Sequence, residues 1–205
     1  MNNFANGFYR LAEWITRFAY VNLLWITFTI FGLVVFGFMP ATVSMFAVVR
    51  RWVQGDQDIK IFNTFWESYR KEFFKANIIG YILLIIGYVL SIELKILRAS
   101  DQLMYLIASY GVIAVIVLYL IVLMYFFPIF VHFNLKSSEY LKWPFIIGII
   151  HPILTIFLLV ILGVLYYITV QNLPILLFLF GGSVTAFILT WGASQTFSKF
   201  EKVGT

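Results

Sequence analysis

Four long segments of the chain contain no charged side chain, and they constrain the fold more than any other feature. They are residues 18–49, 76–92, 102–135 and 143–198. As helices they would measure roughly 48, 26, 51 and 84 Å, whereas the hydrocarbon core of a bilayer is about 30 Å thick. Because 62% of the residues are hydrophobic and only 11% are charged, a soluble core could not bury so much apolar surface. The sequence therefore predicts an all-α, polytopic integral membrane protein.

The order of apolar and polar segments predicts one transmembrane domain over residues 1–205, with five to six membrane helices. An amphipathic stripe near the N-terminus predicts an interfacial helix, because its apolar side chains recur at spacings of three and four. In chain order we expect that interfacial helix (1–17), a broken helical hairpin (18–53), a cytoplasmic interfacial segment (54–75), four membrane spans (76–198) and a tail (199–205).

The first charge-free segment is too long for one perpendicular span and short for two. Gly32 and Gly37 loosen its middle. Pro40 suits the first turn of a new helix, where its missing N–H costs nothing. We therefore expect one helix to end near residue 36 and a shorter helix to run from Pro40 to about Val53.

Short polar stretches divide the rest of the chain. Residues 99–102 predict a turn, after which a long helix should continue to about Phe133. Residues 136–144 predict a loop, and the uncharged sequence at 171–174 predicts the turn between the last two spans. Gly182 and the other small residues of the last span (Ala186, Gly192 and Ala193) would allow a close helix–helix contact.

The distribution of Lys and Arg indicates the orientation. If residues 18–53 form a hairpin, all basic residues except Lys95 and Arg98 share one side. If that segment crosses only once, the N-terminal arginines move to the opposite side and the asymmetry weakens. The positive-inside rule favours the hairpin, and both arrangements place the 50–75 loop and the C-terminus in the cytoplasm. This bias also accounts for the net charge of +5 without a nucleic-acid partner.

Few side chains in the sequence could carry chemistry. His151, before Pro152, is compatible with an intramembrane proton relay or with a neutral imidazole bonded to a neighbouring helix. His132 lies where interfacial water would suffice for it. Asp56 and Asp58 have the D-x-D spacing of some metal sites, but no third ligand is evident. With no cysteine and no catalytic motif, we expect no enzyme activity, no metal and no other cofactor.

A specific combination of residues between positions 37 and 80 resembles the YesL (DUF624) family of bacterial membrane proteins. It consists of Gly37, Pro40-Ala41-Thr42, Phe46-Ala47-Val48, Arg50-Arg51-Trp52, Gly55, Ile61-Phe62, Phe65-Trp66, Tyr69-Arg70, Glu72-Phe73, Asn77 and Gly80. The resemblance implies a small protein of the bacterial cell membrane with no established catalytic activity. It also implies genes that often stand beside those for carbohydrate ABC importers and polysaccharide-degrading enzymes.

These observations favour a non-catalytic accessory or assembly subunit that binds the transmembrane subunits of a carbohydrate ABC importer. The small residues after Pro40 would let a partner helix approach closely. The alternative is a small independent transporter or channel for a sugar or a polysaccharide degradation product. The predicted docking surface comprises Pro40, Ala41, Thr42, Ser44, Ala47, Arg50, Arg51, Trp52, Phe65, Trp66, Tyr69 and Phe73.

Overall fold

The structure, a computed structural model, describes residues 2–135 and 139–200, with the side chains of residues 7–135 and 139–197. In these ranges all regular secondary structure is α-helical. The helices are α1 (Asn2–Phe31), α2 (Val35–Val53), α3 (Ile61–Arg98), α4 (Leu103–His132), α5 (Glu139–Ile150), α6 (Pro152–Asn172) and α7 (Ile175–Phe200).

Five of the described helices are long and apolar enough to cross a membrane: α1 from Gly7, α3, α4, α6 and α7 up to Phe197. Many of their large hydrophobic side chains are exposed on the outside of the protein. Such a surface is stable in lipid and not in water. The structure thus confirms the prediction of an all-α, multi-pass membrane protein.

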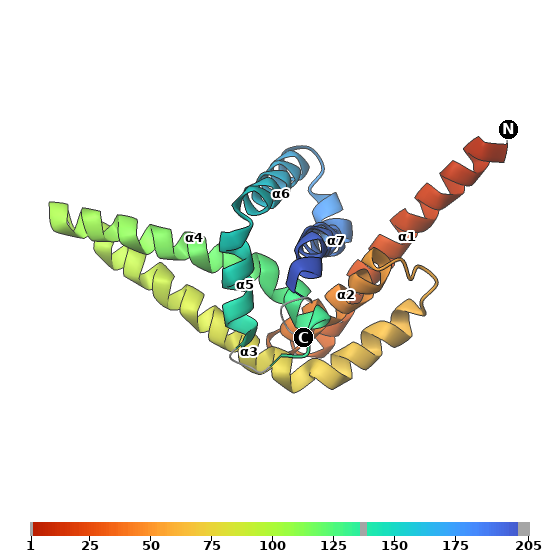
Figure 1. Cartoon of the computed structure of the whole chain (residues 1–205), viewed down its shortest axis with the longest axis horizontal. Helices are drawn as coiled ribbons and strands as arrows, with labels where there is room; N and C mark the ends of the chain where they lie inside the picture. The colour runs from red at the N-terminus through yellow and green to blue at the C-terminus, as the bar shows by residue number, and fades with distance from the viewer. Residues whose placement is uncertain (1, 136–138, 201–205) are drawn as a thin grey trace.

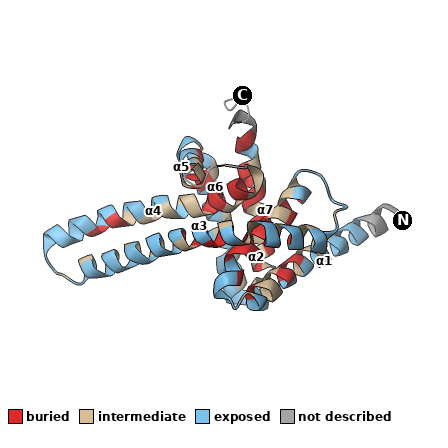
Figure 2. Ribbon diagram, turned by 90° about the horizontal axis from the view of Figure 1, so that it is seen from below, coloured by how far each residue is buried: buried red, intermediate tan, exposed pale blue. Residues whose placement is uncertain are grey.

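Helix α2 lies at the centre of the fold. It packs against α1, α3, α4 and α7, and nearly all of its residues from Met39 to Val49 are buried. Figure 2 shows the buried residues concentrated where these helices meet. Helix α2, which carries most of the predicted docking residues, is therefore the core of the protein.

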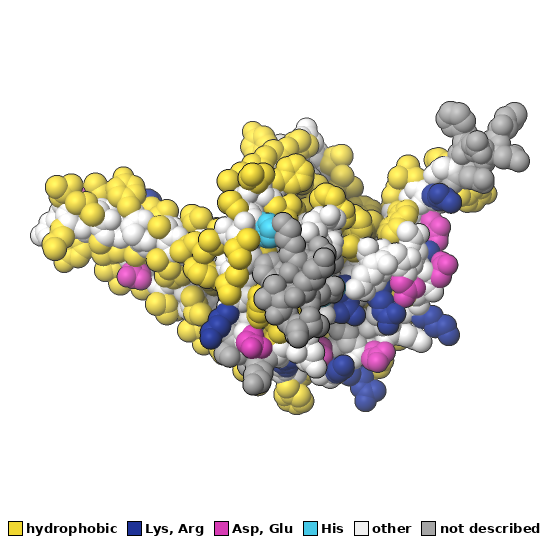
Figure 3. Space-filling view, in the orientation of Figure 1, with side chains coloured by type: hydrophobic (Ala, Val, Ile, Leu, Met, Phe, Trp, Pro, Cys, Tyr) yellow, Lys and Arg dark blue, Asp and Glu magenta, His cyan; other side chains and the backbone are white. Residues whose placement is uncertain are grey.

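Helices α3 and α4 extend beyond this core as a two-helix arm, shown in Figures 1 and 2. The Tyr119 hydroxyl joins them by donating to the carbonyl of Leu83 at 2.9 Å. Gly87 lies directly against the Tyr119 ring, because a Cβ there would lie 2.7 Å from the hydroxyl oxygen. Figure 3 shows that the visible surface of this arm is largely hydrophobic, as expected for a segment in lipid.

The N-terminal segment forms one continuous helix with the first span, so the expected boundary at residue 17 is wrong. Helix α1 runs unbroken from Asn2 to Phe31. The amphipathic first turns continue into the spanning part of the helix without a break, because no Gly or Pro interrupts the backbone between residues 8 and 31.

The predicted hairpin is present, but its turn lies earlier than expected. The chain reverses at residues 32–34, and Pro40 lies inside α2 instead of at its first turn. Leu33 and Val34 adopt positive φ angles of 56° and 64°. Gly32 and Gly37 allow this tight reversal, since a Cβ on Gly32 would lie 2.2 Å from the Cα of Gly37.

The second half of the chain follows the prediction with one exception. The turns at 99–102 and near 173–174 are confirmed, and α4 ends at His132. Residues 139–144, expected in a loop, instead begin the short helix α5. Pro144 lies inside this helix, at its sixth residue, where it has no N–H to donate to the carbonyl of Tyr140. Residues 136–138 and 201–205, part of the predicted loop and tail, lie outside the described residues.

Candidate functional site

Helices α1 and α2 form an antiparallel pair held by aromatic contacts. The indole N–H of Trp25 donates to the hydroxyl of Thr42 at 3.0 Å. Nearer the loop that follows α2, the rings of Trp14 and Trp52 meet edge to face with centroids 5.6 Å apart. These pairs fix the register of the hairpin and bury Trp52, which sequence reasoning placed on a docking surface.

Pro40 is accommodated inside α2 by a side chain from another helix. A proline has no N–H to donate to the carbonyl four residues earlier, here that of Phe36. The Nδ2 group of Asn77 on α3 donates to this carbonyl at 2.9 Å, and also to the carbonyl of Phe73 at 2.9 Å. Asn77 therefore replaces the missing bond and joins α2 to α3.

The small residues after Pro40 pack against this chain's own helices. Ala41 and Ser44 are fully buried, and Pro40 and Thr42 are also buried. The Ser44 hydroxyl donates to the carbonyl of Pro40 at 2.7 Å. Only Ala47 among the predicted small residues is partly exposed, and it borders the pocket described below. The expectation that these residues offer an accessible docking face is wrong, because α1, α3, α4 and α7 already cover α2.

The predicted aromatic residues of α3 divide into an inner and an outer face. Phe65 and Tyr69 face inward and pack on Phe28 of α1, with ring centroids 5.2 and 5.1 Å away. Phe73 is half-buried, whereas Trp66 is exposed. Of the aromatic residues proposed for docking, Trp66 alone is exposed, and one side of its ring packs on Phe28 and Tyr69.

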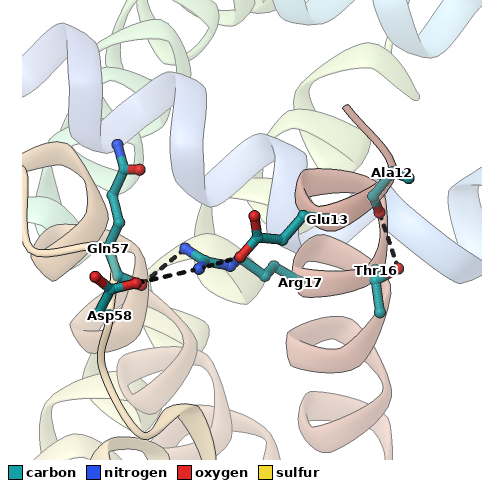
Figure 4. A network of polar contacts seen from close by, with 6 residues as sticks. All are labelled: Ala12, Glu13, Thr16, Arg17, Gln57 and Asp58. Atoms are coloured by element: carbon teal, nitrogen blue, oxygen red, sulfur yellow. Dashed lines mark hydrogen bonds and ion pairs between the residues drawn. The ribbon is translucent and has the colours of Figure 1, made fainter. Parts of the chain in front are cut away.

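A polar network ties α1 to the loop between α2 and α3, as Figure 4 shows. Arg17 donates to the carbonyl of Gln57 at 2.7 Å and pairs with Glu13 at 2.5 Å. Its Nη2 lies 3.7 Å from an oxygen of Asp58. The network places the polar side of α1 and the 54–60 loop at the same end of the hairpin.

The D-x-D sequence is engaged by arginines. Asp56 pairs with Arg51 at 3.0 Å, and Asp58 lies near Arg17. Within the described part of the chain, no three acidic or histidine side chains come together as a metal site would require. Charge pairing across the loop explains these two carboxylates without a bound cation.

A polar pocket of about 390 Å³ opens beside this loop, between α2, the first half of α3, the end of α4 and Tyr140 of α5. Figure 3 shows charged side chains gathered on this part of the molecule. Lys75 reaches across it, donating to the Tyr140 hydroxyl at 2.9 Å. Sequence reasoning missed this pocket, because its walls come from segments nearly a hundred residues apart along the chain, from Val43 to Tyr140.

Arg50 forms the inner wall of the pocket. Its Nη1 donates to the carbonyl of Val131 near the end of α4. Its Nε is buried and has no hydrogen-bond partner among the residues that the structure describes. Burial, and secondarily the adjacent charge of Arg51, lower the pKa of Arg50 from its ordinary value. An arginine remains charged nonetheless, so this site holds a cation that is incompletely compensated.

The two histidines lie at different places in the fold, His132 at the end of α4 and His151 just before α6. His151 precedes α6, and its carbonyl accepts from the backbone N–H and the hydroxyl of Thr155. Thr155 in turn lies 3.0 Å from the Tyr125 hydroxyl. His132 lines the polar pocket, and its ring contacts Phe197 with centroids 4.5 Å apart. The relay and the structural alternative for His151 both stay predictions.

The small residues of α7 form the close helix contact that their spacing predicts. The Oδ1 of Asn22 on α1 accepts from the backbone N–H of Ser183 at 3.1 Å. A Cβ on Gly182 would lie 2.9 Å from that oxygen. Further along α7, Ala186 and Ala193 are fully buried, so the contact is internal to the protein.

This is a multi-pass α-helical membrane protein. Its helices long enough to span the membrane surround a buried central hairpin, and many of its charged side chains gather at one end of that hairpin. The family model described as "Protein of unknown function, DUF624" matches residues 18–94. These residues cover the second half of α1, all of α2 and most of α3, which are the hairpin and the helix that Asn77 joins to it.

Three proteins of Bacillus subtilis (strain 168) are similar to the chain. Uncharacterized protein YesL is 32% identical, with 98% of this chain and 95% of YesL covered. Uncharacterized protein YesV is 34% identical over 96% of this chain and 94% of its own. Uncharacterized protein YteU is 38% identical over 78% of this chain and 71% of its own. The chain therefore belongs to the YesL (DUF624) family. No solved structure matches it.

Proposed function

We propose that this protein is a non-catalytic accessory subunit of a carbohydrate ABC importer in the bacterial cell membrane. In this role it binds the importer's transmembrane subunits at the cytoplasmic membrane surface and carries no sugar itself. The gene neighbourhood implied by the family resemblance supplies the class of partner. The contacts within the described residues supply the reasons to prefer this role over transport.

The buried polar side chains support an accessory role over a sugar carrier. A carrier for polar sugars needs amides and carboxylates facing a passage near the bilayer midplane. Here Asn22 and Asn77 bond to backbone groups of neighbouring helices, and Thr42 bonds to the carbonyl of Phe38. These side chains hold helices together, so they are not available to replace the water around a sugar.

The observation that carries the proposal is an exposed aromatic stripe on the first half of α3. Phe62, Trp66 and Phe74 lie at multiples of four residues along one side of the helix and are exposed. Arg70 lies between them, with its guanidinium 5.6 Å from the Trp66 ring centroid. Exposed Trp, Phe and Arg side chains together are typical of protein interfaces, where they contribute most of the binding energy.

The stripe lies on the half of α3 that precedes its charge-free part, and its side chains stay exposed although the rings of Phe62 and Trp66 also contact Phe28 of α1. A transmembrane partner can therefore reach it without any rearrangement of the core. This surface replaces the buried small residues of α2 as the docking site, and it retains Trp66 from the surface expected from sequence. The residues outside the described ranges do not enter this argument.

Co-purification tests the proposal. The tagged protein is captured from gently solubilised native membranes, and the accompanying proteins are identified and quantified by mass spectrometry. We expect ABC importer membrane subunits and their ATPase in constant ratio to the bait. The double variant Trp66→Ala with Phe74→Ala should lower their recovery by about tenfold, the effect of losing roughly 1.4 kcal/mol of binding free energy.

The matched control is Tyr88→Ala with Tyr110→Ala, which removes two exposed aromatic rings from the α3–α4 arm. This control should leave recovery unchanged. Capture of the bait without importer subunits, together with sugar uptake by the purified protein alone in liposomes, would contradict the proposal and favour the independent transporter.

A further inference from the structure

The polar pocket combines an excess of positive charge with an apolar floor. Beside His132 and Tyr140, its wall carries the charged side chains of Arg50, Arg51, Lys71, Lys75, Glu67 and Glu72. Four of them are cationic and two are anionic, so the pocket is positive at neutral pH. Val43 and Phe130 form part of its apolar lining, close to where α4 ends its run through the membrane.

Two of these cations have donors that the described structure leaves unused. Arg51 pairs with Asp56, and Lys75 donates to the Tyr140 hydroxyl. By contrast, the Nε of Arg50 is buried with no hydrogen-bond partner among the described residues. Lys71 on α3 is exposed, and within the described ranges its ammonium is more than 4 Å from every carboxylate.

A cation without a counter-ion in a partly buried site is costly, and an anion in the pocket reduces this cost by pairing with the charge of the guanidinium. The guanidinium and the ammonium come from two different helices, so one anion between them would be held on two sides. Phosphate suits this pair, because it accepts both the planar fork of arginine and the point charge of lysine.

We propose that this pocket binds the phosphate group of an anionic lipid headgroup. The apolar floor beside the end of a spanning helix suits a ligand with acyl chains, and basic pockets between membrane helices are typical sites for anionic headgroups. Free inorganic phosphate has the same recognition chemistry and is the second source of such a group. This inference does not depend on the proposed importer association.

Thermal unfolding in lipid nanodiscs tests the proposal, because a ligand that binds only the folded state raises the unfolding midpoint. The protein is placed in phosphatidylcholine discs, in discs with increasing phosphatidylglycerol, and in phosphatidylcholine discs with added sodium phosphate. We expect phosphatidylglycerol to raise the midpoint of the unmodified protein. Lys71→Gln should weaken the apparent affinity by about tenfold, as expected for one lost charge-assisted hydrogen bond.

Arg50→Gln should weaken it further, but this variant also loses the bond to Val131. Lys71→Gln therefore carries the test, since its exposed side chain has no ion pair to lose. The matched control is Lys95→Gln with Arg98→Gln, which removes two cations from the last turn of α3. This control should keep the full response to phosphatidylglycerol.

A response to phosphatidylglycerol that Lys71→Gln reduces and the control retains supports a lipid ligand. The same pattern with sodium phosphate in phosphatidylcholine discs supports the site with the free anion as its ligand. An undiminished response in Lys71→Gln, an equal loss in the control, or no response to either probe would overturn the proposal.

Discussion

At the residue scale, the contact between Asn77 and the backbone of α2 explains how a proline lies inside the most buried helix. Sequence reasoning assigned Pro40 to a helix start, because a proline normally removes a bond that nothing replaces. It could not find the replacement donor, which lies on α3 in a segment with its own apolar pattern. The kinds of residue at the hairpin were therefore predictable, but not the position of its turn.

Asn77→Leu should destabilise the protein by about 1–3 kcal/mol, because it leaves the part-buried carbonyl of Phe36 without its donor. The measurement is the free energy of unfolding in detergent. In the Pro40→Ala background the same change should cost less, since the restored N–H can serve Phe36. Equal costs in both backgrounds would contradict this role of Asn77. Asn172→Leu is the control, because Asn172 is exposed and bonds within its own helix.

At the scale of elements, the turn between α1 and α2 depends on contact between two glycine backbones. A Cβ on Gly37 would lie 2.5 Å from the carbonyl oxygen of Thr29. Gly37→Ala should therefore force the two helices apart and destabilise the protein by about 3 kcal/mol. The unfolding midpoint in detergent measures this effect.

Gly111→Ala is the matched control, because nothing lies within 4 Å of a Cβ at that position on α4. This variant should unfold at or slightly above the unmodified midpoint, since alanine favours helix more than glycine does. A similar loss of stability in both variants would contradict the role of the close contact at the turn.

The sequence predicts helices better than their interruptions. The lengths of the charge-free segments were enough to predict the spans that became α4, α6 and α7. The polar residues at 99–102 were enough to predict the turn there. Helix α5 was missed because a Trp-Pro sequence in a polar stretch resembles a loop when its packing is unknown. The polar pocket was missed because Arg50, Lys71 and Tyr140 come together only through tertiary packing.

At the scale of the whole molecule, the hairpin and the charge distribution predict the orientation in the membrane. The chain has no cysteine, so single-cysteine variants report one position each. Tyr9→Cys and Asp58→Cys should react only with reagent on the cytoplasmic side, because Arg17 joins α1 to the 54–60 loop. Ser100→Cys, beyond the end of α3, should react from outside.

An impermeant thiol reagent added to intact cells and to inverted vesicles distinguishes these sides. Labelling of Tyr9→Cys from outside, with Asp58→Cys labelled from inside, would show that the first charge-free segment crosses the membrane an odd number of times. In that case α1 and α2 would not form a hairpin in the membrane-embedded protein.

We expect the exposed stripe of α3 to contact an importer subunit at the cytoplasmic membrane surface, and site-specific photo-crosslinking detects such a contact. A photoreactive amino acid replaces Trp66 in one strain and Tyr88 in another, and adducts formed in living cells are identified by mass spectrometry. The account predicts a permease adduct from position 66 and none from position 88. Adducts from neither position, or equal permease adducts from both, would contradict it.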